Sequence, residues 1–385
     1  MNRKRIIHCA AAILMAAASL SAQNKSAGIN LSIWKGISTQ PLDSTQTSYL
    51  NLGIFSTMNR LNGVGINALG SVARRDMNGI QLSGLSSLTG GSMRGMQLSG
   101  ICNVNGNNMA GMSASGLINI AGSGARGMML SGLSNITGDR TAGVVAGGLL
   151  NVAGESAAGV QLSGMANITG KNFAGVSFSG LLNVAGNDMR GLQMAGLINV
   201  AGAKLAGMQI GLFNYATQAD GVQLGLVNYR QKEMKGIQLG LINACPTTEV
   251  DILMYGGNRT AGNIAARFKN RMLYTIVGLG GYRLDLNDRF SATAFYRAGI
   301  SVPVVKRLSL SGDVGYEHIE AFDNKDAATP ARLYALQTRI SAELKIAPRF
   351  GIFLSGGYDW TRRYGHAGNF DKGLFGEAGI ILSAK

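Results

Sequence analysis

Histidine is the side chain best suited to act as a general acid, general base or metal ligand near neutral pH, and this sequence has three. His318 lies in the segment EHIE (317–320), close to Asp323, and this is the one local cluster of titratable groups that resembles an acid–base or metal-binding set. The cluster would have no chemical role if it lay at the end of a strand or in a loop at the rim of a β-barrel, and we favour that interpretation. His366 lies in a glycine-rich segment beside no nucleophile, and His8 lies in a segment that we expect to be removed.

No other arrangement of residues predicts catalysis. A hydrolase needs a histidine held beside a serine or aspartate partner, and the sequence offers no such set. Spacings such as G-x-G-x-x-G arise here by accident because the chain has 56 glycines, and without a following helix they form no phosphate site. We therefore predict a protein that is not an enzyme, with no catalytic residue, no metal site and no cofactor. The sequence identifies no ligand-binding residue.

The N-terminal segment has the pattern of a secretory signal peptide. Basic residues at positions 3–5 precede an apolar stretch over 6–20, which ends in the small-residue run SLSA (19–22). The charges hold the start of such a segment inside the cell while the short apolar helix enters the export machinery. We predict a signal peptide over 1–22 and an exported mature chain.

Composition limits the function classes further. Only Cys102 and Cys245 remain after residue 22, too few for a disulfide framework. The formal charge is +15, and we attribute the excess to solvated loops that face lipid phosphate groups. No nucleic-acid-binding motif accompanies the charge, so we predict no nucleic-acid partner. Beyond the signal no apolar run reaches the ~18 residues that a transmembrane helix needs, but a closed β-barrel needs no such run.

The strongest signal is an internal repeat of 16 residues. Taking the recurring glycine as position 1, the consensus is GVQLSGLLNVAG followed by four variable residues. Position 9 is asparagine in most units, and from Gly207 to about Pro246 the units shorten. We predict structural roles for the glycines at position 1 and the asparagines at position 9, namely Gly95, Gly111, Gly127, Gly143, Gly159, Gly175, Gly191, Gly207, Asn103, Asn119, Asn135, Asn151, Asn167, Asn183 and Asn199.

Two β architectures accommodate such a unit. In a β-solenoid each unit is one coil, so equal residues lie above one another about 4.8 Å apart, which explains their identity from unit to unit. In an up-and-down barrel each unit is one strand and a turn. The array contains only Phe173 and Phe178 as aromatics between residues 79 and 206, and it therefore lacks the aromatic girdle of a membrane barrel. We favour the solenoid and keep one large barrel as the alternative.

One position of the unit complicates the solenoid. A two-sided coil with its asparagines turned inward exposes position 10, which is always apolar, and the sequence offers no reason for this. Glutamine at position 3 forms a row that we expect on an outer face, where a solvated polar ladder is favoured over a row that binds a ligand.

The segments that flank the array have the texture of barrel strands. Stretches of ten or more residues alternate apolar with small or polar residues between 272 and 384, and aromatics lie near their ends, as an aromatic girdle requires. The segments 29–38 and 48–58 show the same alternation. We predict an all-β chain that combines the solenoid-like array (63–247) with an outer-membrane-type antiparallel barrel of about eight to ten strands, formed by 27–60 and 250–385, in which 251–268 supplies a possible extra hairpin.

The stretch from about 27 to 247 resembles a glycine-rich surface-repeat family of spirochaete and Bacteroidota outer-membrane proteins, in which G-x-Q-x-G-L-x-N units precede a barrel-like part. The motif stands here as GMQIGLFN (207–214), GVQLGLVN (221–228) and GIQLGLIN (236–243). The resemblance implies location at the bacterial outer membrane, in contact with its lipid. It implies no activity, cofactor or catalytic residue.

These observations lead to two main hypotheses for the function. In the first, a barrel anchors a regular array that binds another envelope protein, a glycan or a host surface molecule, or is structural. The sequence leaves open whether this array is exposed at the cell surface or faces the periplasm. In the second, all units join one wide barrel that forms a porin-like channel for transport. A membrane-embedded hydrolase that uses His318 is the third and weakest hypothesis.

Overall fold

The computed structural model describes residues 28–34, 36–40, 46–232, 236–283, 290–322, 331–365 and 370–384. The predicted signal peptide, Asp323 and His366 lie outside these ranges. The chain divides into two compact units, one up to Gly211 and one from Leu212. The described part is built from strands, and it contains no helix that is long and apolar enough to cross a membrane.

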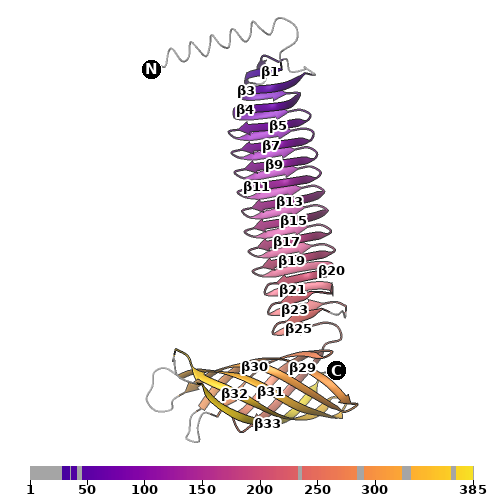
Figure 1. Ribbon diagram of the computed structural model, residues 1–385, viewed down its shortest axis with the longest axis vertical. Coiled ribbons are helices and arrows are strands. Elements are labelled where there is room, and N and C mark those ends of the chain that lie inside the picture. The colour runs from indigo at the N-terminus through magenta and orange to yellow at the C-terminus, as the bar shows by residue number, and fades with distance from the viewer. Residues whose placement is uncertain are drawn as a thin grey trace. The chain divides into compact units, whose positions relative to one another are not determined.

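The first unit is a β-solenoid, as its repeat predicted. Each 16-residue unit makes one coil with a long and a short strand, and Figure 1 shows the successive coils stacked along the array. Neighbouring coils pair in parallel with a shift of one unit, so that Gly127 lies beside Gly143 and Asn119 beside Asn135. The alternative of one large antiparallel barrel is therefore wrong.

The strands alternate along the chain. The long strands are β5 (Met77–Ser83), β7 (Met93–Ser99), β9 (Met109–Ser115), β11 (Ala125–Ser131), β13 (Arg140–Gly147), β15 (Ser156–Ser163), β17 (Phe173–Ser179) and β19 (Met189–Ala195). The short strands are β6 (Ser86–Thr89), β8 (Cys102–Asn105), β10 (Ile118–Ala121), β12 (Ser134–Thr137), β14 (Leu150–Ala153), β16 (Ala166–Thr169) and β18 (Leu182–Ala185). The continuous strand β20 (Ile198–Ile210) ends this unit.

The segment 27–60 does not belong to the barrel, and this prediction is corrected. Strands β1 (Ile29–Trp34), β3 (Thr47–Met58) and β4 (Arg60–Ala73) pair in parallel as the first coils of the solenoid, with β2 (Ile37–Ser38) folded back on β1. The alternation that suggested barrel strands is common to both architectures, because every half-buried strand alternates. The overlooked signal is asparagine, since Asn30 donates to Asn51 and Asn51 donates to Asn67 at 2.8 and 3.0 Å.

The second unit begins within the first of the three shorter coils. Their strands are β21 (Phe213–Ala219), β22 (Val222–Leu224), β23 (Val227–Arg230), β24 (Ile237–Leu239) and β25 (Ile242–Ala244). Pairing is again parallel, with Asn214 beside Asn228 and Asn228 beside Asn243.

An antiparallel eight-stranded closed barrel follows, as predicted for the C-terminal part. Its strands are β26 (Glu249–Gly257), β27 (Thr260–Asn270), β28 (Leu273–Tyr282), β29 (Phe290–Val305), β30 (Leu308–Phe322), β31 (Ala331–Ala347), β32 (Phe350–Arg363) and β33 (Asp371–Ser383), and β26 pairs with β33 to close it (Figure 1). The hairpin β26–β27 supplies the two strands that we had expected from the N-terminal segment.

Candidate functional site

Glycine is required at position 1 because the backbones of two neighbouring coils approach each other closely there. In Gly111 the φ angle is +126°, a conformation that side chains rarely adopt, and an added Cβ would lie 2.0 Å from the carbonyl oxygen of Gly95 in the preceding coil. The other predicted glycines, from Gly95 to Gly207, have positive φ and the same close approach. The recurrence of this residue therefore has a structural cause.

The asparagines at position 9 form a buried ladder inside the array. Asn119 donates from Nδ2 to Oδ1 of Asn135 at 2.9 Å, and the next steps, Asn135 to Asn151 and Asn151 to Asn167, measure 2.9 and 2.8 Å. The same amide nitrogens also donate to backbone carbonyls, for example to the oxygen of Leu130. A buried amide must be hydrogen-bonded, and stacking provides its partner in the neighbouring coil.

The glutamines at position 3 also point inward, which corrects our expectation of a solvated outer row. Gln97 donates to Gln81 at 3.2 Å, and Gln209 donates to Gln193 at 2.9 Å. These four side chains are buried. The inside of the array is therefore polar along two rows, and it offers no open glutamine surface to a ligand.

Several outward positions of the array are apolar in every unit. Position 7 carries Leu85, Ile101, Leu117, Leu133, Leu149, Met165, Leu181 and Leu197, which are between 37% and 47% exposed. Position 10 also faces outward, as in Ile136, because its neighbours Asn135 and Thr137 point inward. The apolar residue at position 10, which the sequence left without a reason, is thus part of an apolar outer surface.

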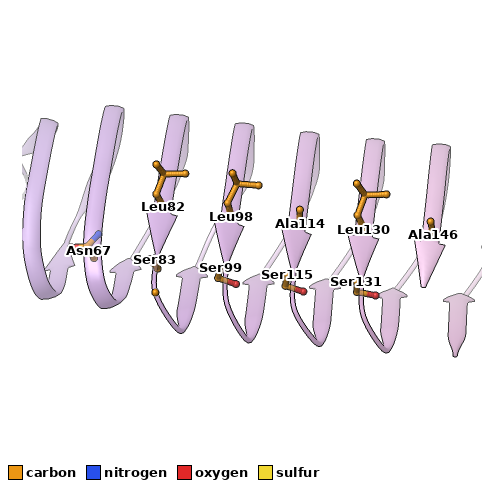
Figure 2. Close-up of a pocket in the computed structure, with 11 residues that line it drawn as sticks. Asn67, Leu82, Ser83, Leu98, Ser99, Ala114, Ser115, Leu130, Ser131 and Ala146 are labelled. Carbon is orange, nitrogen blue, oxygen red and sulfur yellow. The ribbon is translucent and has the colours of Figure 1, made fainter. Parts of the chain in front are cut away.

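A groove of about 650 Å³ runs along this outer surface across several coils. Figure 2 shows its two rows, the leucines and alanines of position 4 and the serines of position 5 beside the turn. The rows are Leu82, Leu98, Ala114, Leu130 and Ala146, and Ser83, Ser99, Ser115 and Ser131. No charged side chain lines the groove.

The inside of the barrel contains a buried ionic network. Asp313 accepts from Arg297 at 3.2 Å and from Arg339 at 2.8 Å, and Arg339 reaches Glu377 at 3.1 Å. These four side chains are at most 6% exposed. Charges at such depth persist because each has an opposite partner.

A second group of ions lies in the same interior. Arg267 contacts Asp251 at 2.8 Å and Glu343 at 2.7 Å. The sequence contains a signal for both groups, because these charges occupy inward positions of strands whose outward side chains are mostly apolar. The two members of each ion pair lie far apart in the chain, however, and the sequence does not show which charge pairs with which.

The structure divides the cluster around His318. Glu317 points into the barrel, where Gln337 donates to it at 3.0 Å, whereas His318 lies on the outward side with Glu320 at 3.0 Å and Tyr364 at 3.1 Å. Glu320 also pairs with Arg332. Within the described ranges no three His, Cys, Asp or Glu side chains gather so as to hold a metal ion.

The last coil of the array is seated on the outward wall of the barrel. Asn243 donates to Thr275 at 3.2 Å, Asn270 donates to the carbonyl of Asn243 at 2.9 Å, and Tyr296 donates to the carbonyl of Gly240 at 3.2 Å. Thr275 follows the inward-pointing Tyr274 and so occupies an outward position of β28, yet it is buried by this coil.

No protein-family model and no curated protein matches the chain. Among solved structures, the chain is similar to Neisserial surface protein A (12% identity, 35% of this chain and 94% of that chain, TM-score 0.27) and to the N-terminal β-barrel domain of Pseudomonas aeruginosa OprF (13%, 35% and 96%, 0.26). The Yersinia pestis outer membrane protein Ail is similar at 16% identity over 35% and 99%, with a TM-score of 0.24. At these TM-scores the likeness carries no argument about the role of this chain.

Proposed function

We propose that this chain is a bacterial outer-membrane protein without catalytic activity, in which the barrel is the anchor and the array has a structural or binding role. The observation that carries the proposal is that the barrel is polar inside and apolar outside, the reverse of a water-soluble protein. Its inside holds Arg297, Asp313 and Arg339, whereas outward positions such as Ile340 and Leu354 are apolar and 71% and 67% exposed. A barrel with an apolar outer wall and a polar inside is built for lipid surroundings.

The interior argues against the porin-like alternative. A barrel of eight strands has room inside for its own side chains and for little else, and here the space contains the two ionic groups described above. The purified full-length protein should therefore give no conductance steps in planar bilayers. Steady ohmic steps under conditions that preserve the folded barrel would restore the channel hypothesis.

The lengths of the connections indicate how the barrel is oriented. At the end where β26 begins, all three connections between strands have two residues (271–272, 306–307 and 348–349), whereas three of four at the other end have seven or eight. Barrels of this kind have short periplasmic turns and longer extracellular loops. The chain therefore joins the barrel at the periplasmic end, and we propose that the array lies in the periplasm, a choice that the sequence left open.

Thiol labelling of intact cells tests this orientation. In a chain with Cys102 and Cys245 replaced by serine, Asn187→Cys places a thiol in a turn of the array, and Asp326→Cys places one in a long connection of the barrel. We expect a membrane-impermeant maleimide to label residue 326 on intact cells and residue 187 only after the outer membrane is permeabilised. Labelling of residue 187 on intact cells would contradict the periplasmic array but would leave the barrel anchor standing.

A further inference from the structure

We infer that the edge of the array formed by positions 5–7 is a lipid-binding surface that inserts into the apolar layer of a phospholipid bilayer. The inference rests on the proposed membrane location of the barrel and adds a second membrane contact, made by the solenoid itself. Four independent features of the array support it.

The first feature is the placement of charge. Between Gly63 and Gly211 the chain has eight Arg and Lys and four Asp and Glu, and every one of them lies at positions 12–16 of its unit. Positions 1–11 carry no charge in any unit of this stretch. The charges lie in the turn that follows the short strand, at positions 12–14, or at position 16 near the start of the next long strand, whereas positions 5–7 form the opposite turn, at the end of the long strand. The array therefore has one charged edge and one edge without charge along its whole length.

The second feature is the uniformity of the uncharged edge. Position 7 is Leu, Ile or Met in all eight units from Leu85 to Leu197, and each side chain is more than a third exposed. At about 4.8 Å per coil, this row is roughly 34 Å long. The outward positions on either side, such as Leu130 at position 4 and Ile136 at position 10, are apolar as well. An apolar surface of this extent is unusual on a protein that faces only water.

The third feature is the pairing of the backbone at this edge. The N–H of Leu133 donates to the carbonyl of Leu117 at 2.9 Å, and the N–H of Leu149 donates to that of Leu133 at 2.8 Å. The same bond recurs at every position 7 from Leu85 to Leu197, with distances between 2.7 and 3.2 Å. Unpaired backbone groups are what normally exclude turns from hydrocarbon, and these turns use the N–H and carbonyl of position 7 within the stack.

The fourth feature is the position of the same edge in the last coil. Gly240 and Leu241 belong to the turn equivalent to positions 6 and 7, and their carbonyls accept hydrogen bonds from Tyr296 and Thr275 on the outward wall of the barrel, at 3.2 and 3.4 Å. This wall is the surface that we assign to lipid. Within the second unit, the uncharged edge is therefore already seated at the lipid-facing surface of the barrel.

Lipid fits this edge better than a protein partner does. Protein interfaces form about one hydrogen bond per 100–200 Å² and have a polar rim. This edge instead offers the outward apolar side chains of position 7, with the small serines of position 5 beside them, and a backbone that is paired at position 7. The opposite edge has an excess of cations, from Arg74 to Lys204, which suits the phosphate groups of a membrane surface. An amphipathic cross-section of this kind is the β counterpart of an interfacial amphipathic helix.

Spin labelling of the reconstituted protein tests the inference. The mature full-length chain, with both natural cysteines replaced by serine, receives one nitroxide at Leu133→Cys on the uncharged edge, Asn187→Cys on the charged edge or Ile340→Cys on the outer wall of the barrel. Each variant is placed in vesicles of phosphatidylethanolamine and phosphatidylglycerol. Power saturation then compares collisions with oxygen, which concentrates in lipid, and with a water-soluble nickel complex.

We expect the labels at 133 and 340 to collide preferentially with oxygen and the label at 187 to collide with nickel. If 340 reports lipid but 133 collides with nickel as readily as 187, the array faces water and this inference fails while the barrel anchor stands. If 133 is shielded from both reagents and shows spin–spin broadening, a second copy covers the edge, and the inference is also overturned. A label at 340 that reports water would contradict the proposed function itself.

Discussion

Asn119 and Asn135 lie 16 residues apart in the chain and directly beside each other in the solenoid, where the amide of Asn119 donates to the amide oxygen of Asn135 at 2.9 Å. Each asparagine of the ladder is thus both donor and acceptor for the coils next to it. The ladder stabilises the array as an unbroken series, because replacing one asparagine leaves polar groups unpaired in two coils.

We expect Asn135→Ala to destabilise the array by about 1–3 kcal/mol, since it deprives Asn151 Oδ1 and the carbonyl of Ala146 of their donor. Hydrogen exchange detected by mass spectrometry should show the loss in the coils around residue 135. Asn108→Ala is the matched control, because Asn108 accepts a bond from the Gly124 N–H in an exposed turn. Equal effects of both changes would show that the buried ladder has no special weight.

Gly111→Ala should be among the most damaging single substitutions in the array. The φ angle of +126° and a Cβ 2.0 Å from the Gly95 carbonyl leave no room without a shift of the backbone, and we expect a loss of at least about 3 kcal/mol. At Gly124 the nearest atom to an added Cβ is the flexible side chain of Asn108 at 2.9 Å, so Gly124→Ala should be mild. Thermal unfolding followed by circular dichroism compares the two variants.

Substitutions of Phe173 and Phe178 test which side of strand β17 faces the inside of the solenoid. Phe173 is 2% exposed and Phe178 is 37% exposed, although they lie on the same strand, β17. Phe173→Ala should cost about 3–5 kcal/mol through the cavity it leaves, whereas Phe178→Ala should change stability in detergent far less. Denaturant titration of both variants measures the difference, and a larger loss at 178 would refute the inward assignment.

The stability of the barrel should be sensitive to substitution of Asp313, the centre of the buried ionic network. Asp313→Asn removes the charge that faces both Arg297 and Arg339, and breaking a buried pair in this way costs about 3–5 kcal/mol. The temperature at which the folded band disappears in semi-native gel electrophoresis should fall. Glu320→Gln, in the partly exposed pair with Arg332, should lower it far less, and an equal fall would mean that burial of the network is irrelevant.

Much of the fold could be predicted from the sequence. The 16-residue period indicated a stack of coils because only parallel stacking places equal residues side by side, and Asn119 beside Asn135 is its direct consequence. The alternation after residue 250 indicated the C-terminal barrel. Both signals are local, since period and alternation can be measured on the chain itself.

Only the tertiary structure decided which neighbours each strand has. Strands β1 and β3 alternate like barrel strands but pair in parallel with the array, and Gln97 could point in or out until its coil was closed. The contact of Thr275 with the last coil, and that of Asp313 with Arg339, join segments whose individual sequences contain no trace of the partner. Burial and pairing depend on the surfaces that meet in space, and the order of residues along one strand does not specify those surfaces.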